Sequence, residues 1–229
     1  MTAPAAATRF HDRLDAGSQL ARRLEHLRNE PDLLIIGLPR GGVPVASCVA
    51  RHLGAPLDVL VVRKVGLPGH EELALGAVAA GGLTVKNAEI VRLSNVPSNV
   101  VDDAIARELR MADLDEQRFH HSSKTKVDVA NRTLVIVDDG IATGATITAA
   151  IELAVANGSR RVVAAAPVAP FEVLAEIARI ADEVVCILPV HGFGSVSEYY
   201  DDFRPVSDEE VLEELRNTAE DSHEQDWSR

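Results

Sequence analysis

The chain has 229 residues, of which 46% are apolar and 25% charged, so it is long enough for one sizeable globular domain of ordinary composition. Its formal net charge is −12 and it has no basic stripe, which makes it a poor candidate for sequence-independent binding of nucleic acid. No apolar run approaches the roughly 20 residues that span a bilayer, and the N-terminal stretch lacks a hydrophobic signal core, so we expect a cytoplasmic protein with no membrane partner.

The two cysteines agree with this expectation. Cys48 and Cys186 each lie within an apolar stretch, and we interpret them as reduced core residues rather than as a disulfide or a reactive pair. Aromatic residues make up only 3% of the chain. The core should therefore consist mainly of valine, leucine, isoleucine and alanine.

Short apolar runs alternate with helical patterns, which is typical of βαβ units and a parallel sheet. In chain order the predicted elements are a helix over 12–28, a strand over 33–37, a helix over 44–53, a strand over 57–62, a strand over 133–137, a helix over 145–156, a strand over 161–166, a helix over 171–181 and a strand over 183–188. The predicted fold class is therefore α/β, with a Rossmann-like central parallel β-sheet flanked by helices.

A long insertion, over about 66–130, separates the second predicted strand from the third. Its first part, 73–93, predicts short strands joined by the pair Gly81-Gly82, and 98–119 predicts a charged helix. The polar stretch 120–126 has no periodicity and is predicted to be a mobile loop.

Residues 1–207 are expected to form one domain, with its core over 33–188 and the insertion as a hood or flexible region. Residues 208–229 differ in composition, because they hold nine acidic residues against two arginines, a net charge of −7. We interpret this segment as a solvated acidic C-terminal helix that frays into a tail.

The most informative segment is the turn after the strand over 133–137. Asp138 and Asp139 stand together at the strand's end, and because burying unpaired charge is costly, they must meet solvent, a metal or ligand hydroxyls. The small residues of 142–146 then open a helix, whose backbone N–H groups and dipole favour a bound phosphate. Neither a GxxxxGK[ST] loop nor a GxGxxG motif occurs. We predict a phosphate on this helix start with polyol or metal contacts beside it; the alternative is an acidic strand end whose helix is capped by Thr143.

Parallel sheets bind ligands beyond the carboxyl ends of their strands, so the turns after the other strands are candidates as well. The turn after the first strand holds Arg40, Gly41 and Gly42, where the glycines allow close backbone approach and the arginine supplies positive charge. The second strand is followed by Arg63 and Lys64. The alternatives are a surface Pro/Gly turn in the first case and a solvated basic pair in the second.

The segment 134–146 resembles the 5-phosphoribosyl-1-pyrophosphate (PRPP) binding motif of type I phosphoribosyltransferases, which has four apolar residues, two acids and a Thr-Gly-x-Thr loop. The stretch Leu38-Pro39-Arg40-Gly41-Gly42 resembles the family's pyrophosphate loop, and Arg63-Lys64 resembles an Arg-Lys pair of its adenine-type members. The resemblance extends over about 33–188. It implies a type I phosphoribosyltransferase-like fold.

The resemblance also implies a role for each matched residue. Asp138 and Asp139 would hold the ribose 2′- and 3′-hydroxyls and would contact Mg²⁺ indirectly, through PRPP. Arg40 and Lys64 are the catalytic candidates, because they can neutralise the departing pyrophosphate. The residues expected to bind PRPP are Arg40, Gly41, Gly42, Arg63, Lys64, Asp138, Asp139, Gly140, Ile141, Ala142, Thr143, Gly144, Ala145 and Thr146.

The implied reaction is displacement of pyrophosphate from the anomeric carbon of PRPP by a nitrogenous base, through a transition state that resembles an oxocarbenium ion. Mg²⁺ is the implied cofactor, and PRPP or a nucleotide and a base are the implied partners. Dimers are common in the family, so a homodimer is also expected. The family's pyrophosphate loop often carries a cis peptide, for which the bond of Pro39 itself is the least costly place.

One position departs from the best-known members of the family. In hypoxanthine-guanine-type members the residue before Thr-Gly is an Asp near the purine N7, and here it is Ala142. This argues against a 6-oxopurine acceptor, whereas adenine- and orotate-type members also have a small residue there. Glu71, Glu72 or Glu108 could supply an acid from the insertion, although a solvated carboxylate is the simpler interpretation of each.

The acceptor would be selected by a variable hood, for which the candidates are the insertion and the segment 191–203. Four of the chain's aromatic residues lie in that segment and could stack on a planar base. The alternative is that these rings pack onto the sheet. His70, His120 and His121 have no second ligand at metal spacing, so we interpret them as surface residues.

Three functions remain open at this point. The first is an active transferase on a nitrogenous base. The second is a catalytically silent regulator that senses PRPP or a nucleotide on the same fold. The third is a different phosphate-ester enzyme or a partner-docking module, because a fold does not determine a function. Pyrophosphate release with a panel of bases separates the first from the second.

Overall fold

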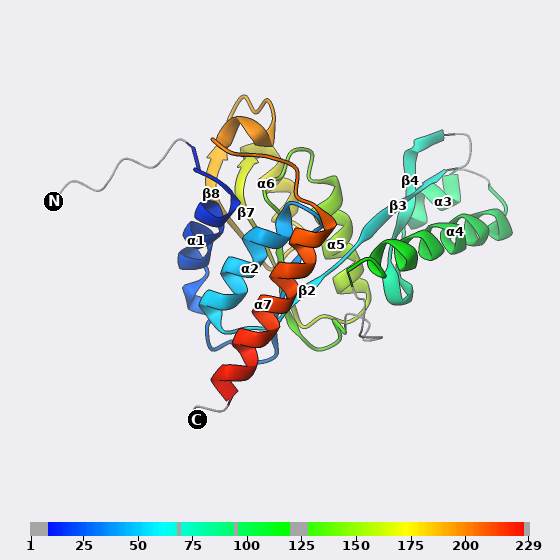
Figure 1. The fold of residues 1–229 in the computed structure, drawn as a ribbon. Helices are drawn as coiled ribbons and strands as arrows, with labels where there is room; N and C mark the ends of the chain where they lie inside the picture. Colours follow the sequence, from blue (N-terminus) through cyan, green and yellow to red (C-terminus); the bar gives the residue numbers. More distant parts are fainter. Residues whose placement is uncertain (1–8, 68–69, 94–95, 120–127, 227–229) are drawn as a thin grey trace.

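The computed structural model describes residues 9–67, 70–93, 96–119 and 128–226. Its centre is a five-stranded sheet of β1 (Leu33–Gly37), β2 (Leu57–Val59), β6 (Thr133–Val137), β7 (Arg161–Pro170) and β8 (Glu183–Val190). The spatial order is β2-β1-β6-β7-β8, and every neighbouring pair is parallel. This confirms the predicted α/β class with a central parallel sheet (Figure 1).

Helices cover both faces of this sheet. They are α1 (Arg13–Arg23), α2 (Gly42–Leu53), α5 (Ala145–Ala156), α6 (Phe171–Ile177) and α7 (Asp208–Asp226), with the short 3₁₀ segments η1 (Glu25–Leu27) and η3 (Val196–Tyr199). The first predicted helix ends early and continues as η1, α6 also stops before its predicted end, and β7 runs longer than predicted. Within the described part of the chain, no helix is both long enough and apolar enough to cross a membrane.

The strands at the centre of the sheet send alternate side chains into two cores. Leu34 and Ile136 belong to the core that α5 covers, whereas Ile35 and Val135 belong to the core that α1 and α2 cover. Because both faces are buried, these strands are apolar at nearly every position, as is usual for a parallel sheet, and Thr133 at the start of β6 is the polar exception. A polar ligand can therefore contact this sheet only at the ends of its strands.

The insertion forms a second lobe, which extends to one side of the sheet (Figure 1). It contains β3 (Val62–Leu67), β4 (His70–Ala79), η2 (Ala80–Gly82), β5 (Leu83–Lys86), α3 (Ala88–Leu93) and α4 (Ser98–Glu116). The three strands pair antiparallel, and their core includes Val65, Val78 and Ile105. The predicted strands are confirmed as far as Lys86, and the predicted helix over 98–119 is confirmed as α4. The strand prediction is wrong over 88–93, which forms the helix α3, and the predicted loop 120–126 lies outside the described residues.

The predicted single strand over 57–62 is wrong, because the chain changes sheets within it. β2 stops where its partner β1 stops, at Gly37, and the chain then pairs with β4 from Val62 onward. The two residues between are buried, so the apolar run gives no sign of the break. Arg63 and Lys64 therefore lie inside a strand of the second sheet and not in a turn.

The acidic C-terminal segment is docked on the domain. α7 lies beside α2 (Figure 1), and its Val211 is fully buried in a cluster with Val43. Ser47 Oγ donates a hydrogen bond to Glu214, and Arg51 Nη1 lies 3.1 Å from Glu214 Oε2. The expectation of a solvated helix is therefore wrong for the first part of α7, because an apolar contact and an ion pair attach it to α2.

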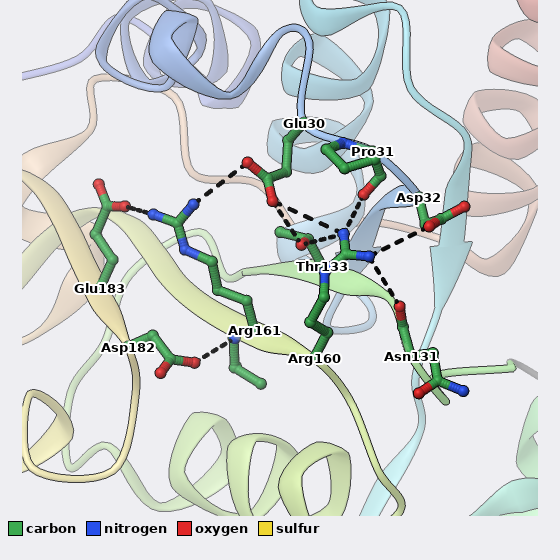
Figure 2. A network of polar contacts seen from close by, with 10 residues as sticks. Glu30, Pro31, Asp32, Asn131, Thr133, Arg160, Arg161, Asp182 and Glu183 are labelled. Carbon is green, nitrogen blue, oxygen red and sulfur yellow. Dashed lines mark hydrogen bonds and ion pairs between the residues drawn. The ribbon is translucent and has the colours of Figure 1, made fainter.

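A network of charged residues closes the amino edge of the sheet (Figure 2). Arg160 Nη2 donates to Thr133 Oγ1 at 2.9 Å, and Arg161 Nη2 donates to Glu183 Oε2 at 2.8 Å. Glu30 accepts from Thr133 Oγ1 at 3.0 Å and lies 3.5 Å from Arg161 Nη1. These contacts join the first residues of β6, β7 and β8 at the edge opposite the predicted site.

Candidate functional site at the carboxyl edge of the sheet

The predicted phosphate-binding turn leads from β6 into α5. Gly144, the residue before α5, has a φ of 74°, and a Cβ there would lie 2.7 Å from Val173 Cγ1, so glycine is required on both counts. Ala142, Thr143 and Thr146 are exposed around it. The turn thus combines small, accessible side chains with the first N–H groups of a helix, which have no partner within the helix.

The acid pair lies between this turn and the end of β6. Asp139 is buried, with 9% of its surface exposed, and Asp138 is half-buried. Asp138 Oδ1 accepts a hydrogen bond from the Asp139 backbone N–H at 2.9 Å. Burial, with the neighbouring Asp139 carboxylate, raises the pKa of Asp138 to about 8. Burial also raises the pKa of Asp139, and the positive charge of Arg13 opposes that change.

Arg13 is a residue of this site that its position in the sequence does not reveal. Its Nε donates to Asp139 Oδ2 at 2.8 Å, across a sequence separation of 126 residues. The expectation that both acids must meet solvent, a metal or a ligand is therefore wrong for Asp139, because a guanidinium inside the protein satisfies it. Arg13 is one of several charged residues in an amphipathic helix pattern, and nothing in that pattern indicates a contact with the strand end.

The aromatic segment after β8 packs against the same place. Tyr200 is 4% exposed, its hydroxyl donates to the backbone carbonyl of Asp139 at 2.5 Å, and its ring centroid lies 5.4 Å from that of Phe10. Phe203 stacks on the guanidinium of Arg13, with 4.0 Å between Cζ and the ring centroid. For Tyr200 and Phe203 the structure therefore supports the packing alternative.

The predicted pyrophosphate loop contacts the acid pair directly. A Cβ at Gly41 would collide with the Asp139 carboxylate, and a Cβ at Gly42 would lie 2.6 Å from the carbonyl oxygen of Val137. A cis peptide bond joins Pro39 to Arg40, so this loop has the cis bond that the family resemblance implied as common, and the bond follows the proline. The two predicted segments, far apart in sequence, are thus brought together.

The side chain of Arg40 is mostly exposed beside the C-terminal segment. Its Nη1 lies 3.7 Å from Asp208 Oδ1 and donates to the carbonyl oxygen of Val206 at 3.4 Å. The ion pair is exposed on both sides and worth little in stability. The guanidinium is therefore available to an anionic ligand above the loop.

Arg63 and Lys64 are not brought together, because neighbours in a strand point to opposite faces. Arg63 faces α4, where its nitrogens lie 3.0 Å from Glu108 Oε2 and 2.9 Å from Asp115 Oδ2. Lys64 faces α5 and lines a cavity of about 700 Å³ together with Ala145, the first residue of that helix. Lys64 thus shares a cavity with α5, including its first residue, whereas Arg63 is paired with two carboxylates of α4.

Of the acids and histidines singled out in the insertion, the structure describes the side chain of Glu108 alone. Glu108 is paired with Arg63 and only 16% of its side chain is exposed. The side chains of Glu71, Glu72 and His70, and both residues His120-His121, lie outside the part of the chain whose side chains are described. Within the described ranges no three histidine, cysteine, aspartate or glutamate residues are grouped to hold a metal ion on their own.

Comparison with known proteins gives consistent matches. The family described as "Phosphoribosyl transferase domain" matches residues 11–202. The crystal structure of TT1426 from Thermus thermophilus is similar over 91% of this chain and 98% of that one, with 41% identity and a TM-score of 0.82. Two strains of Mycobacterium tuberculosis have a protein with the provisional name phosphoribosyl transferase, which is 44% identical over 203 residues. That match covers 89% of this chain and 45% of the relative, so the chain spans less than half of the relative's length.

Proposed function

This chain belongs to the phosphoribosyl transferase family, and we propose that it binds PRPP with Mg²⁺ and transfers the 5-phosphoribosyl group to a nitrogenous base, releasing pyrophosphate. The observation that carries this proposal is the contact between Gly41 and Asp139. It unites a glycine turn suited to pyrophosphate, an acid pair suited to a diol and a helix start suited to phosphate at one sheet edge. The reaction would be a step of nucleotide metabolism.

Each part of this edge has a task in the proposal. The N–H groups of 142–146, with Gly140 and Ile141 leading into them, bind the 5′-phosphate, because the helix dipole favours negative charge there. The acid pair accepts hydrogen bonds from the ribose hydroxyls. Backbone groups of Gly41 and Gly42 hold the pyrophosphate. Arg40 and Lys64 supply positive charge to the leaving group, and Arg63 supports Lys64 by fixing the strand that carries it.

The donor set fits a magnesium ion that is bound mainly through the ligand. Asp138 and Asp139 supply two carboxyl groups, too few to hold a metal ion by protein ligands alone. Among the described residues no third acid joins them. Mg²⁺ prefers such oxygen ligands and is held by one or two carboxylates together with substrate phosphates. When bound, it would neutralise charge on the departing pyrophosphate.

The rest of the catalysis would come from position and charge. Holding the ribose and pyrophosphate in fixed places lowers the entropic part of the barrier, and preorganised donors stabilise the charge that develops on the leaving group. Ala142 is exposed next to the turn and carries no acid. This supports an acceptor other than a 6-oxopurine. Both cysteines are free thiols, which agrees with a reducing, cytoplasmic compartment.

A second candidate is a silent sensor that binds PRPP or a nucleotide without turnover. The observation that favours it is the ion pair between Arg13 and Asp139, which occupies one of the two acids. A site of this kind could still hold the phosphates through the helix start. Its defining property would be ligand binding without pyrophosphate release.

One experiment separates the two candidates. Pyrophosphate release from PRPP and Mg²⁺ is measured with a panel of purine, pyrimidine and pyridine bases, and PRPP binding is measured in parallel by calorimetry. Release with one base supports the transferase. Binding without release from any base supports the sensor, and absence of binding contradicts both. Sedimentation in the same buffer tests the expected homodimer.

A further inference from the structure

We propose that Arg13 is the positioning residue of the acid pair: it fixes the side chain of Asp139 from outside the PRPP motif and leaves Asp138 as the acid whose side-chain oxygen meets the ribose hydroxyls. This inference rests on the proposed function. It divides between two residues a task that the sequence motif assigns to both. It also adds a residue from the N-terminal helix to the site.

The contacts of Arg13 fix its guanidinium in one orientation. Its Nε donates to Asp139 Oδ2 at 2.8 Å, its Nη1 donates to the carbonyl oxygen of Arg204 at 2.8 Å, and its plane lies over the ring of Phe203. Only 11% of the side chain is exposed. A planar fork with several donors can make these contacts at once, whereas a lysine ammonium cannot.

Asp139 is held on the remaining sides as well. The turn at Gly41 packs against its carboxylate, and the hydroxyl of Tyr200 donates to its backbone carbonyl. A substrate hydroxyl would have to compete with an arginine for a carboxylate that is only 13% exposed. The protein itself therefore occupies Asp139 Oδ2 and fixes the position of this carboxyl group.

Asp138 has a different environment. Its Oδ1 accepts from the backbone N–H of Asp139, and its Oδ2 makes no hydrogen bond to any residue of the described ranges. The free oxygen thus lies next to a carboxylate whose position is already set. A ribose hydroxyl can donate to it without displacing a protein group.

A purely structural role for Arg13 makes a different prediction. If the arginine only attached the C-terminal segment through Arg204 and Phe203, its loss would disturb the nearby Arg40 loop as much as the acids. The positioning role concerns the ribose and not the pyrophosphate. Ligands that contain one part but not the other therefore distinguish the two roles.

The experiment compares Arg13→Gln with the control Arg9→Gln, which removes a neighbouring exposed arginine that is 3.8 Å from Asp201. Calorimetry measures the affinity of each folded variant for Mg²⁺-PRPP, ribose 5-phosphate and pyrophosphate. We expect Arg13→Gln to weaken both ribose ligands by about tenfold or more, because it leaves a carboxylate buried without its partner, and to leave pyrophosphate unchanged. Arg9→Gln should match the wild type with all three.

A double-mutant cycle with Asp139→Asn tests the route of the effect. Without a charge to hold, the loss of Arg13 should cost little further affinity, so the double variant should match Asp139→Asn alone. Arg13→Lys, which keeps the charge, should restore only part of the affinity and serves if Arg13→Gln does not fold. Equal weakening of pyrophosphate and ribose ligands, or unchanged affinity for all three, overturns the inference. Wild-type protein that binds no ribose ligand overturns the proposed function itself.

Discussion

A Cβ atom at Gly41 would collide with Oδ2 of Asp139, so the turn after β1 and the acid pair after β6 are packed without room for a side chain. These two segments come from neighbouring strands of the sheet, and their strands are in register from Leu33-Thr133 to Gly37-Val137. The sheet thus determines how the two halves of the proposed ligand site meet.

Gly41→Ala should therefore disrupt the site. The new methyl group must displace either the turn or the carboxylate, so PRPP affinity should fall by about tenfold or more, which corresponds to about 1.4 kcal/mol or more of binding free energy. Calorimetry with Mg²⁺-PRPP measures this. Gly158→Ala is the control, because its φ of 84° strains an alanine although nothing lies within 4 Å of the new atom. That variant should lose stability and keep its affinity; equal affinities for both variants would contradict the predicted contact.

Asp138→Asn should change how stability depends on pH. The pKa of Asp138 is raised from 3.8 to about 8 in the folded protein. The stability that its protonated form contributes is fully present below about pH 4 and is lost as the pH rises through about 8. The variant, which cannot ionise there, should thus be more stable than the wild type above about pH 8, by several kcal/mol at about 1.4 kcal/mol per unit of pKa shift.

Urea unfolding of both proteins from about pH 4 to about pH 9, without divalent ions, measures this difference. Asp103→Asn removes an exposed carboxylate of α4 and is the control. Its stability should follow that of the wild type at every pH. A constant difference between Asp138→Asn and wild type would show that Asp138 is not buried as a neutral acid.

The sheet was predictable because both of its faces are buried. Runs such as 134–137 are apolar at every position and are bounded by polar residues, so the strand and the acids at its end can be read directly. The position of Lys64 was not predictable, since Leu60 and Val61 continue the apolar run while the chain changes sheets. The contact of Arg13 was not predictable either, because it depends on where α1 crosses the strand ends and not on any local pattern.

Lys64→Gln and Arg63→Gln should have opposite consequences although the residues are adjacent. Lys64 is exposed and has no ion pair with any described residue, so its loss should leave the free energy of unfolding within about 0.5 kcal/mol. The substitution should slow pyrophosphate release by about tenfold or more, because it removes the positive charge of Lys64 that would stabilise the departing pyrophosphate. Arg63 contacts two carboxylates of α4, so its loss should cost about 1 kcal/mol in stability.

Denaturant titration and a pyrophosphate-release assay on both variants measure the two effects. A drop in stability with Lys64→Gln, or a larger kinetic effect from Arg63→Gln than from Lys64→Gln, would mean that the two residues have been assigned to the wrong faces of β3. Each variant is the other's control.

Tyr200→Phe should remove one hydrogen bond to the acid pair and keep the packing of the aromatic ring. The change removes the hydroxyl that donates to the Asp139 carbonyl and keeps the ring that packs on Phe10. Loss of one buried hydrogen bond should lower the free energy of unfolding by about 1 kcal/mol, and more if the carbonyl is left without a partner. Tyr199→Phe is the matched control, because Tyr199 is only half-buried and its ring stacks on Phe193 instead. Thermal unfolding of the two variants should therefore show a lower midpoint for Tyr200→Phe alone, and equal midpoints would mean that this hydroxyl does not hold the strand end.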